Sequence, residues 1–185
     1  MPLATDPTGI DSSDPAAGWA VVVRDANQNV VPQIPQEKEE WCWAACAQML
    51  LQFFGIEVQQ CDVASQMFGE PCCANPDSPL CVGPAQVPLI ANIYAQYGHN
   101  ASLISGKVTF ETLQDEINAN RPVIVGFDWG SGTGHQVLVC GWDVDSLGQR
   151  LLVNDPWQGS GPVYYVNLLA AYGLGSWQYT WQSVV

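Results

Sequence analysis

Positive charge is scarce in this chain of 185 residues: five lysine and arginine residues stand against 18 aspartate and glutamate residues, a formal net charge of −13 at pH 7. Proteins that bind nucleic acids or anionic membranes need clustered basic side chains to neutralise phosphates. Five basic residues spread along the sequence do not make such a cluster. We therefore expect neither nucleic acid nor a membrane as a partner.

The chain also lacks long apolar runs, since none approaches the roughly 20 residues of a membrane-spanning helix. Its first residues have neither the basic start nor the apolar centre of a secretory signal peptide. Residues 1–17 are rich in proline, serine, aspartate and glycine, a composition typical of disorder. We expect a disordered segment over 1–17 and a single domain over 18–185, with 48% hydrophobic residues to fill its core.

Cysteine, in contrast, is abundant, with seven residues. Four of them fall in one loop-rich stretch: Cys61, Cys72, Cys73 and Cys81. Zinc ligands are usually separated by about two to four residues, so the adjacent pair Cys72 and Cys73 opposes a zinc site. We predict disulfides in which each of these two bonds either Cys61 or Cys81. Disulfides favour an oxidising compartment, as for a secreted or otherwise exported protein, and we expect no metal or cofactor.

Apolar periodicity and turn residues predict an α+β fold, with helices first and an antiparallel sheet after them. The clearest helix covers 42–54, where Ala45, Met49 and Phe53 recur every four residues and Gly55 can end the helix. It is apolar around most of its circumference, which indicates a central, buried helix. Further helices are predicted at 62–68, 87–97, 109–120 and 168–172, and strands at 19–24, 123–127, 136–142, 151–154, 162–166 and 177–184.

A cysteine stands where this central helix is predicted to begin, within Trp41-Cys42-Trp43. The N-terminus of a helix carries partial positive charge and unpaired N–H groups, which stabilise a thiolate, the nucleophilic form of cysteine. Cys42 is therefore a candidate nucleophile. We expect Trp43 to anchor the helix in the core and Trp41 to line a substrate cleft. Cys46, within the apolar helix, is interpreted as an inert core residue.

A cysteine nucleophile needs a base, and the chain has only two histidines. His135 follows the glycine-rich segment GSGTG at the start of a predicted strand, where it would be held rigidly. His99 follows a helix-ending turn and is interpreted as an exposed surface residue. His135 is therefore the candidate base.

The next predicted strand offers two residues that would orient His135, namely Asn154 and Asp155. Trp157 would then cover the resulting hydrogen bond and line the cleft. An oxyanion would be stabilised by the backbone N–H of Cys42 and by Gln36, six residues earlier, with Gln33 as the weaker alternative.

Together these residues resemble the papain-like cysteine proteases. The matching features are the spacing from Gln36 to Cys42 and Trp43, and the order Gln, Cys, His, Asn/Asp. The segments QEKEEWCWAACAQMLLQFFG, RPVIVGFDWGSGTGHQVLVCGWD and VNDPW look like bacterial papain-like and C39-like peptidases, and AvrRpt2-type effector proteases share WCWAA. The resemblance favours Asp155 over Asn154, because C39-like relatives use the aspartate of an Asp-Pro pair.

The resemblance implies a papain-like fold in which a central buried helix carries the nucleophile and packs against an antiparallel sheet. It implies a thiol peptidase acting on a peptide or protein substrate through an acyl-enzyme. We also expect the protein to be a monomer. Two alternatives remain. The same fold and residues would serve an acyltransferase, deamidase or peptide ligase, and a third possibility is a catalytically silent binding module.

Overall fold

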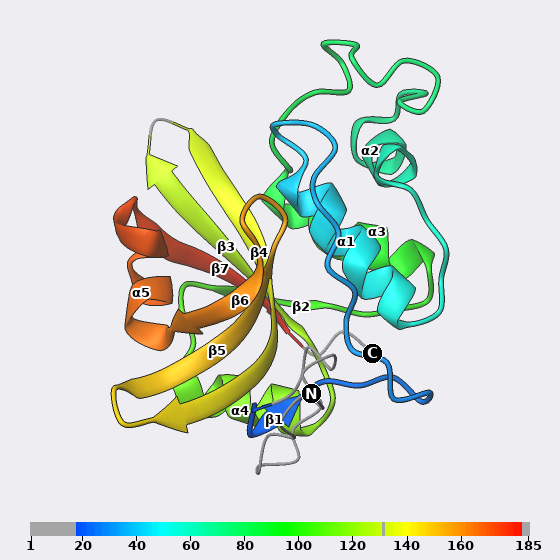
Figure 1. Ribbon diagram of the computed structural model, residues 1–185. Coiled ribbons are helices and arrows are strands. Elements are labelled where there is room, and N and C mark those ends of the chain that lie inside the picture. The colour runs from blue at the N-terminus through cyan, green and yellow to red at the C-terminus, as the bar shows by residue number, and fades with distance from the viewer. Residues whose placement is uncertain (1–17, 131, 183–185) are drawn as a thin grey trace, which may run out of the picture.

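The computed structural model describes residues 18–130 and 132–182, so the prediction for residues 1–17 lies outside the described part of the chain (Figure 1). Helices dominate the first half and strands the second, as expected for an α+β fold. The helices are α1 (Cys42–Phe53), α2 (Gln60–Phe68), α3 (Ile90–Gln96), α4 (Phe110–Asn118) and α5 (Tyr165–Leu169), with 3-10 turns η1 (Val87–Leu89) and η2 (Ala171–Gly173). Within the described residues, no helix combines the length and apolar character that crossing a membrane requires.

The strands form one antiparallel sheet in the order β2-β7-β3-β4-β5-β6, and β1 pairs with β4. They are β1 (Val21–Val22), β2 (Ser102–Ser105), β3 (Val123–Gly130), β4 (Thr133–Asp145), β5 (Gly148–Asp155), β6 (Gly159–Tyr164) and β7 (Ser176–Gln182). The sequence predicted every strand except β2. That strand is only four residues long and mostly exposed, so it carries no apolar alternation to detect.

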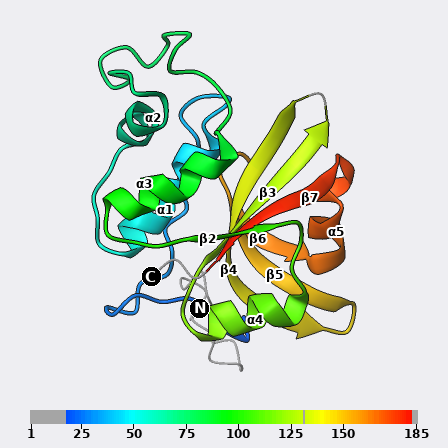
Figure 2. The same ribbon diagram turned by 180° about the vertical axis from the view of Figure 1, so that it is seen from behind.

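The helices cover the sheet unequally (Figures 1 and 2). Helix α1 packs against β4, with α2 and α3 packed on α1, whereas α5 lies on the other side of the sheet against β5, β6 and β7. All residues of α1 are buried except Cys42, Gln48 and Gln52. The prediction of a central, buried helix is therefore confirmed, and this helix presents its first residue at the boundary between the helices and the sheet.

Two disulfides stabilise the loop after α2, and they join Cys61 to Cys73 and Cys72 to Cys81. The prediction that the adjacent cysteines bond to different partners is confirmed, and the structure supplies the pairing that the sequence left open. Both bonds are compatible with an oxidising compartment.

The same loop holds the two tryptophans that flank Cys42. The indole N–H of Trp41 donates to the carbonyl of Cys81 at 2.9 Å, and that of Trp43 donates to the carbonyl of Gly83 at 3.2 Å. Trp43 is 3% exposed, as expected for an anchor in the core. The prediction that Trp41 lines the cleft is wrong: its side chain is 0% exposed, because the disulfide-bonded loop covers it.

Candidate active site

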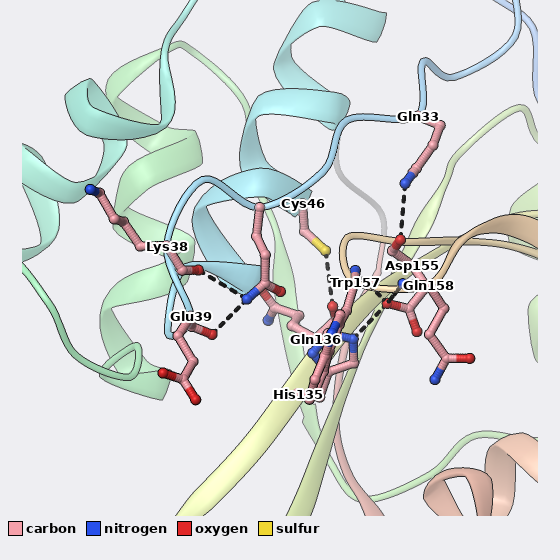
Figure 3. Close-up of polar contacts among 10 residues, drawn as sticks. Gln33, Lys38, Glu39, Cys46, His135, Gln136, Asp155, Trp157 and Gln158 are labelled. Atoms are coloured by element: carbon pink, nitrogen blue, oxygen red, sulfur yellow. Dashed lines mark hydrogen bonds and ion pairs between the residues drawn. The ribbon is translucent and has the colours of Figure 1, made fainter.

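His135 and Asp155 lie on adjacent antiparallel strands, β4 and β5, and their side chains meet. Nε2 of His135 is 2.8 Å from Oδ1 of Asp155, and both side chains are buried (Figure 3). The same oxygen accepts the backbone N–H groups of Trp157 at 2.8 Å and Gln158 at 3.1 Å. These bonds come from the turn after β5, so the carboxylate is fixed by the backbone that follows it.

The pair is arranged to hold opposite charges. Burial alone would lower the pKa of His135, but the hydrogen bonds and charges of Asp155 and Cys42 raise it to about 9. Burial works to raise the pKa of Asp155, yet its hydrogen bond to His135, the charge of that ring and two backbone N–H groups lower it below the ordinary value. An imidazolium beside a carboxylate is therefore the favoured state at neutral pH.

Cys42 differs from the other free cysteines. It is half-buried at the first position of α1, whereas Cys46 and Cys140 are buried. The thiol of Cys46 donates to the backbone carbonyl of Gln136 at 3.4 Å, and burial raises the pKa of both Cys46 and Cys140. These two residues are neutral thiols of the core, as the sequence indicated for Cys46.

A cleft of about 220 Å³ brings Cys42 and His135 to one surface. Its walls come from the start of α1, the segment that leads into α3, and strands β3, β4 and β7. The cleft therefore lies between the helices and the sheet. Trp43 contributes to its wall, whereas Trp41 does not.

The other polar candidates have different partners. Asn154 donates its side-chain N–H groups to the carbonyls of Val31 at 3.1 Å and Pro32 at 3.2 Å, so it tethers the N-terminal segment to the sheet. Gln33 acts in the same way, since its amide donates to the backbone carbonyl of Asp155 at 2.9 Å. The structure thus joins Asp155, and not Asn154, to His135.

The amide nitrogen of Gln36 is occupied in this arrangement. It donates to the carbonyl of Lys38 at 2.9 Å and to that of Glu39 at 2.6 Å, which uses both of its N–H groups (Figure 3). Its side-chain oxygen is buried without a hydrogen-bond partner among the described residues. The backbone N–H of Cys42, at the first helical position, has no partner within the helix.

Two tryptophans flank the imidazole. Trp129 stacks on His135 with ring centroids 5.2 Å apart and planes inclined by 22°. Trp157 meets the same ring edge-on at 6.1 Å and is 67% exposed. Trp157 was predicted to cover the hydrogen bond of His135 and to line the cleft. It contacts His135 but does not line the cleft, and Trp129 was not predicted. The signal available for Trp129 is its position at the end of a strand, just before the glycine-rich turn that leads to His135.

Tyr172 is a second residue that the sequence did not reveal. Its hydroxyl and Oδ2 of Asp155 are both buried, and neither has a partner with full hydrogen-bond geometry among the described residues. Both residues line one cavity of about 140 Å³. Burial and the nearby carboxylate of Asp155 raise the pKa of Tyr172. The residue has a positive φ of 61°, a strained conformation of the kind found at functional sites.

One group of potential metal ligands occurs outside the cleft. Cys61, Asp62 and Cys73 offer ligand atoms within 4.8 Å of one another. The two sulfur atoms are bonded to each other, so they are not free to bind a metal as thiolates.

The sequence from residue 28 to residue 184 matches the Peptidase_C39 like family. Because the match covers most of the chain, the protein belongs to this family of C39-like peptidases. This membership supports a cysteine peptidase activity in general terms. Among curated protein sequences, none matches the chain.

Solved structures agree on the fold. A C39-like peptidase from Bacillus anthracis aligns with a TM-score of 0.61 and 18% identity over 88% of this chain and 96% of the other. The peptidase domain of Streptococcus ComA, a bi-functional ABC transporter involved in quorum sensing, gives 0.56 and 14% over 82% and 96%.

A double glycine motif protease from an AMS/PCAT transporter, solved with its leader peptide, gives a TM-score of 0.54 and 16% identity over 82% of this chain and 91% of the other. At these identities the similarity concerns the fold. The expected α+β, papain-like architecture is therefore confirmed.

Proposed function

We propose that this protein is a thiol peptidase that hydrolyses peptide bonds through an acyl-enzyme, with Cys42, His135 and Asp155 as its catalytic triad. One observation carries the proposal: His135, which contacts the buried Asp155 at 2.8 Å, lines the cleft that also holds Cys42 at the start of a helix. A nucleophile, a base and a group that orients the base are thus in one place.

The reaction follows from these positions. Since Nε2 of His135 faces Asp155, the other ring nitrogen takes the proton of the Cys42 thiol before the substrate is attacked, and the resulting imidazolium is the favoured form of His135 at neutral pH. The thiolate attacks the carbonyl carbon of the substrate, and the imidazolium then gives the proton to the departing amine, so that a thioester on Cys42 remains. Water, deprotonated by His135, hydrolyses this thioester and restores the thiol.

The oxyanion formed in each attack needs hydrogen-bond donors. The backbone N–H of Cys42 serves as the first, because it has no partner within the helix. Gln36 serves as the second, and it does so by releasing the carbonyls of Lys38 and Glu39 when the substrate is bound.

The test is hydrolysis of a mixed peptide pool, followed by mass spectrometry. Cys42→Ala and His135→Ala are expected to abolish cleavage, because they remove the nucleophile and its base. His99→Ala is the matched control, since this second histidine stacks on Phe54 and takes no part in the cleft. Full cleavage by Cys42→Ala would overturn the proposal.

The same experiment separates hydrolysis from acyl transfer. Hydrolysis adds one water to the cleaved peptide, whereas a ligase or acyltransferase joins the acyl group to an amine supplied in the assay. We also propose that the protein works as a monomer. We place it in an oxidising compartment outside the cytosol, and the two disulfides support this location.

A further inference from the structure

The sheet side of the cleft is formed by residues of three adjacent strands. Gly126 on β3 pairs with Gln136 on β4 and with Tyr179 on β7, so these residues face the same side of the sheet, and all three line the cleft. A Cβ atom on Gly126 would lie 3.1 Å from the ring of Trp181 and 3.4 Å from Cβ of Tyr179. Glycine at this position therefore lets the ring of Trp181 lie close to the backbone of β3, where it forms an aromatic wall of the cleft.

A buried side-chain amide, that of Gln136, also borders the cleft. Gln136 is only 4% exposed, its side-chain oxygen has no partner among the described residues, and its position opposite Gly126 turns it toward the cleft. Its backbone carbonyl is held by the thiol of Cys46. A buried acceptor without a partner is costly, so a bound group that donates a hydrogen bond would stabilise it.

Acidic and basic side chains are unequally distributed around the cleft, and acidic ones line it. Glu40 and Asp128 line it, whereas none of the five lysine and arginine residues, all within the described part of the chain, does so. The basic residue nearest in sequence, Lys38, is paired with Asp77 at 2.5 Å. A thiolate and imidazolium at Cys42 and His135 would cancel each other, so the uncompensated charge is negative.

We propose that this cleft selects peptides with a lysine or arginine side chain next to the bond that is cleaved, a specificity that rests on the proposed function. The methylene groups of such a side chain match the apolar walls at Val87, Ile90 and Trp181. Its cationic end donates a hydrogen bond to the oxygen of Gln136 and is attracted by Glu40 and Asp128. An acidic side chain at this place is repelled by the same two carboxylates.

Binding to the Cys42→Ala variant tests the proposal without requiring hydrolysis. The probes are short, blocked, fluorescent alanine–glycine peptides with one lysine at each position in turn, and matched peptides with norleucine in place of lysine. At low salt, the best lysine peptide is expected to bind about tenfold more tightly than its norleucine partner, and added salt reduces the difference. Equal dissociation constants for the two sets would overturn the proposal.

Variants show whether the cleft itself makes the selection. Glu40→Gln combined with Asp128→Asn is expected to reduce the preference to about twofold or less. Gln136→Met weakens binding of the lysine peptide more than that of the norleucine peptide. Glu57→Gln, an exposed acidic residue outside the cleft, is the matched control and keeps the preference. A loss as large in Glu57→Gln would mean that only the net charge attracts the peptides, which contradicts the proposal.

Hydrolysis of the same peptides by the unaltered protein separates the two proposals. Tight binding of lysine peptides without cleavage would contradict the peptidase function and leave the selectivity intact. Cleavage of lysine and norleucine peptides at the same rate would contradict the selectivity and leave the peptidase function intact.

Discussion

The charge on His135 depends on two opposing influences. Burial favours the neutral ring, whereas Asp155 and Cys42 favour the imidazolium and raise its pKa to about 9. A group with a raised pKa keeps its proton up to that value and loses it above. His135 is therefore expected to remain protonated through neutral pH and to titrate near pH 9.

Replacement of Asp155 by asparagine tests this balance. The variant retains a side chain of the same shape but loses the negative charge, so burial dominates and the pKa of His135 falls to or below the ordinary value of about 6.5. Proton NMR of the imidazole rings measures the change directly, because the chain has only two histidines. In Asp115→Asn, an exposed residue of α4, the titration of His135 stays near pH 9. An unchanged titration in Asp155→Asn would contradict the assignment.

Tyr172 lies next to the pair of His135 and Asp155, because its hydroxyl is near the second carboxylate oxygen of Asp155. We propose that this O–H group favours the carboxylate form of Asp155. The ring of Tyr172 is held against Phe127 by an edge-on contact at 5.4 Å. Tyr172 is in this account a positioning residue.

In Tyr172→Phe, the ring remains and the hydroxyl is lost. The pKa of Asp155 is then expected to rise, so the acid limb of the kcat–pH profile moves to higher pH, and kcat falls about five- to tenfold with little change in KM. Tyr165→Phe is the control, since that hydroxyl donates to the carbonyl of Val108 at 2.7 Å. A shifted acid limb in the control, or none in Tyr172→Phe, would refute the role.

Cys42 and His135 were proposed from local signals, a helix start and a glycine-rich turn, whereas Asp155 was favoured over Asn154 only through the resemblance to C39-like peptidases. Trp129 and Tyr172 could not be predicted as neighbours of His135 and Asp155. Their positions depend on the pairing register of β3 with β4 and on a strained turn. The burial of Trp41 was missed for a related reason, because the loop that covers it lies 40 residues away in sequence.

Among the secondary-structure elements, the start of α1 depends on the disulfide-bonded loop. The bonds from Trp41 to Cys81 and from Trp43 to Gly83 join the loop to the two residues that flank Cys42. The bond between Cys72 and Cys81 therefore supports the position of Cys42, whereas that between Cys61 and Cys73 joins the loop to α2.

The two disulfides are expected to differ in their effect on α1. Replacing Cys72 and Cys81 by serine should lower the free energy of unfolding by about 2–4 kcal/mol. It should also increase amide hydrogen exchange over residues 41–47, because the Cys81 carbonyl is no longer held in place. Serine at Cys61 and Cys73 is the matched variant, with a similar loss of stability and less effect on this segment. Equal exchange over 41–47 in both variants would contradict this role of the loop.

At the scale of the whole molecule, the order of the predicted helices and strands along the sequence was sufficient to predict the fold class. The helices come first, and the antiparallel strands follow with short connections, so the predicted α+β class is correct and the cleft lies between the two parts. Strand order, the pairing of β2 with β7 and the disulfide connectivity depend on contacts between distant segments, which periodicity does not encode. The net charge of −13 was visible in the sequence, but the position of Glu40 and Asp128 in the wall of the cleft required the structure.

The most direct test of the account is the mass of the intact protein after acid quenching of its reaction with an activated peptide ester. The account predicts one acyl group per molecule, attached as a thioester to Cys42 and absent from Cys42→Ala, with Cys46 and Cys140 unmodified. An acyl group on any other side chain, or hydrolysis of the ester by Cys42→Ala at the unaltered rate, would contradict the claim that Cys42 is the nucleophile.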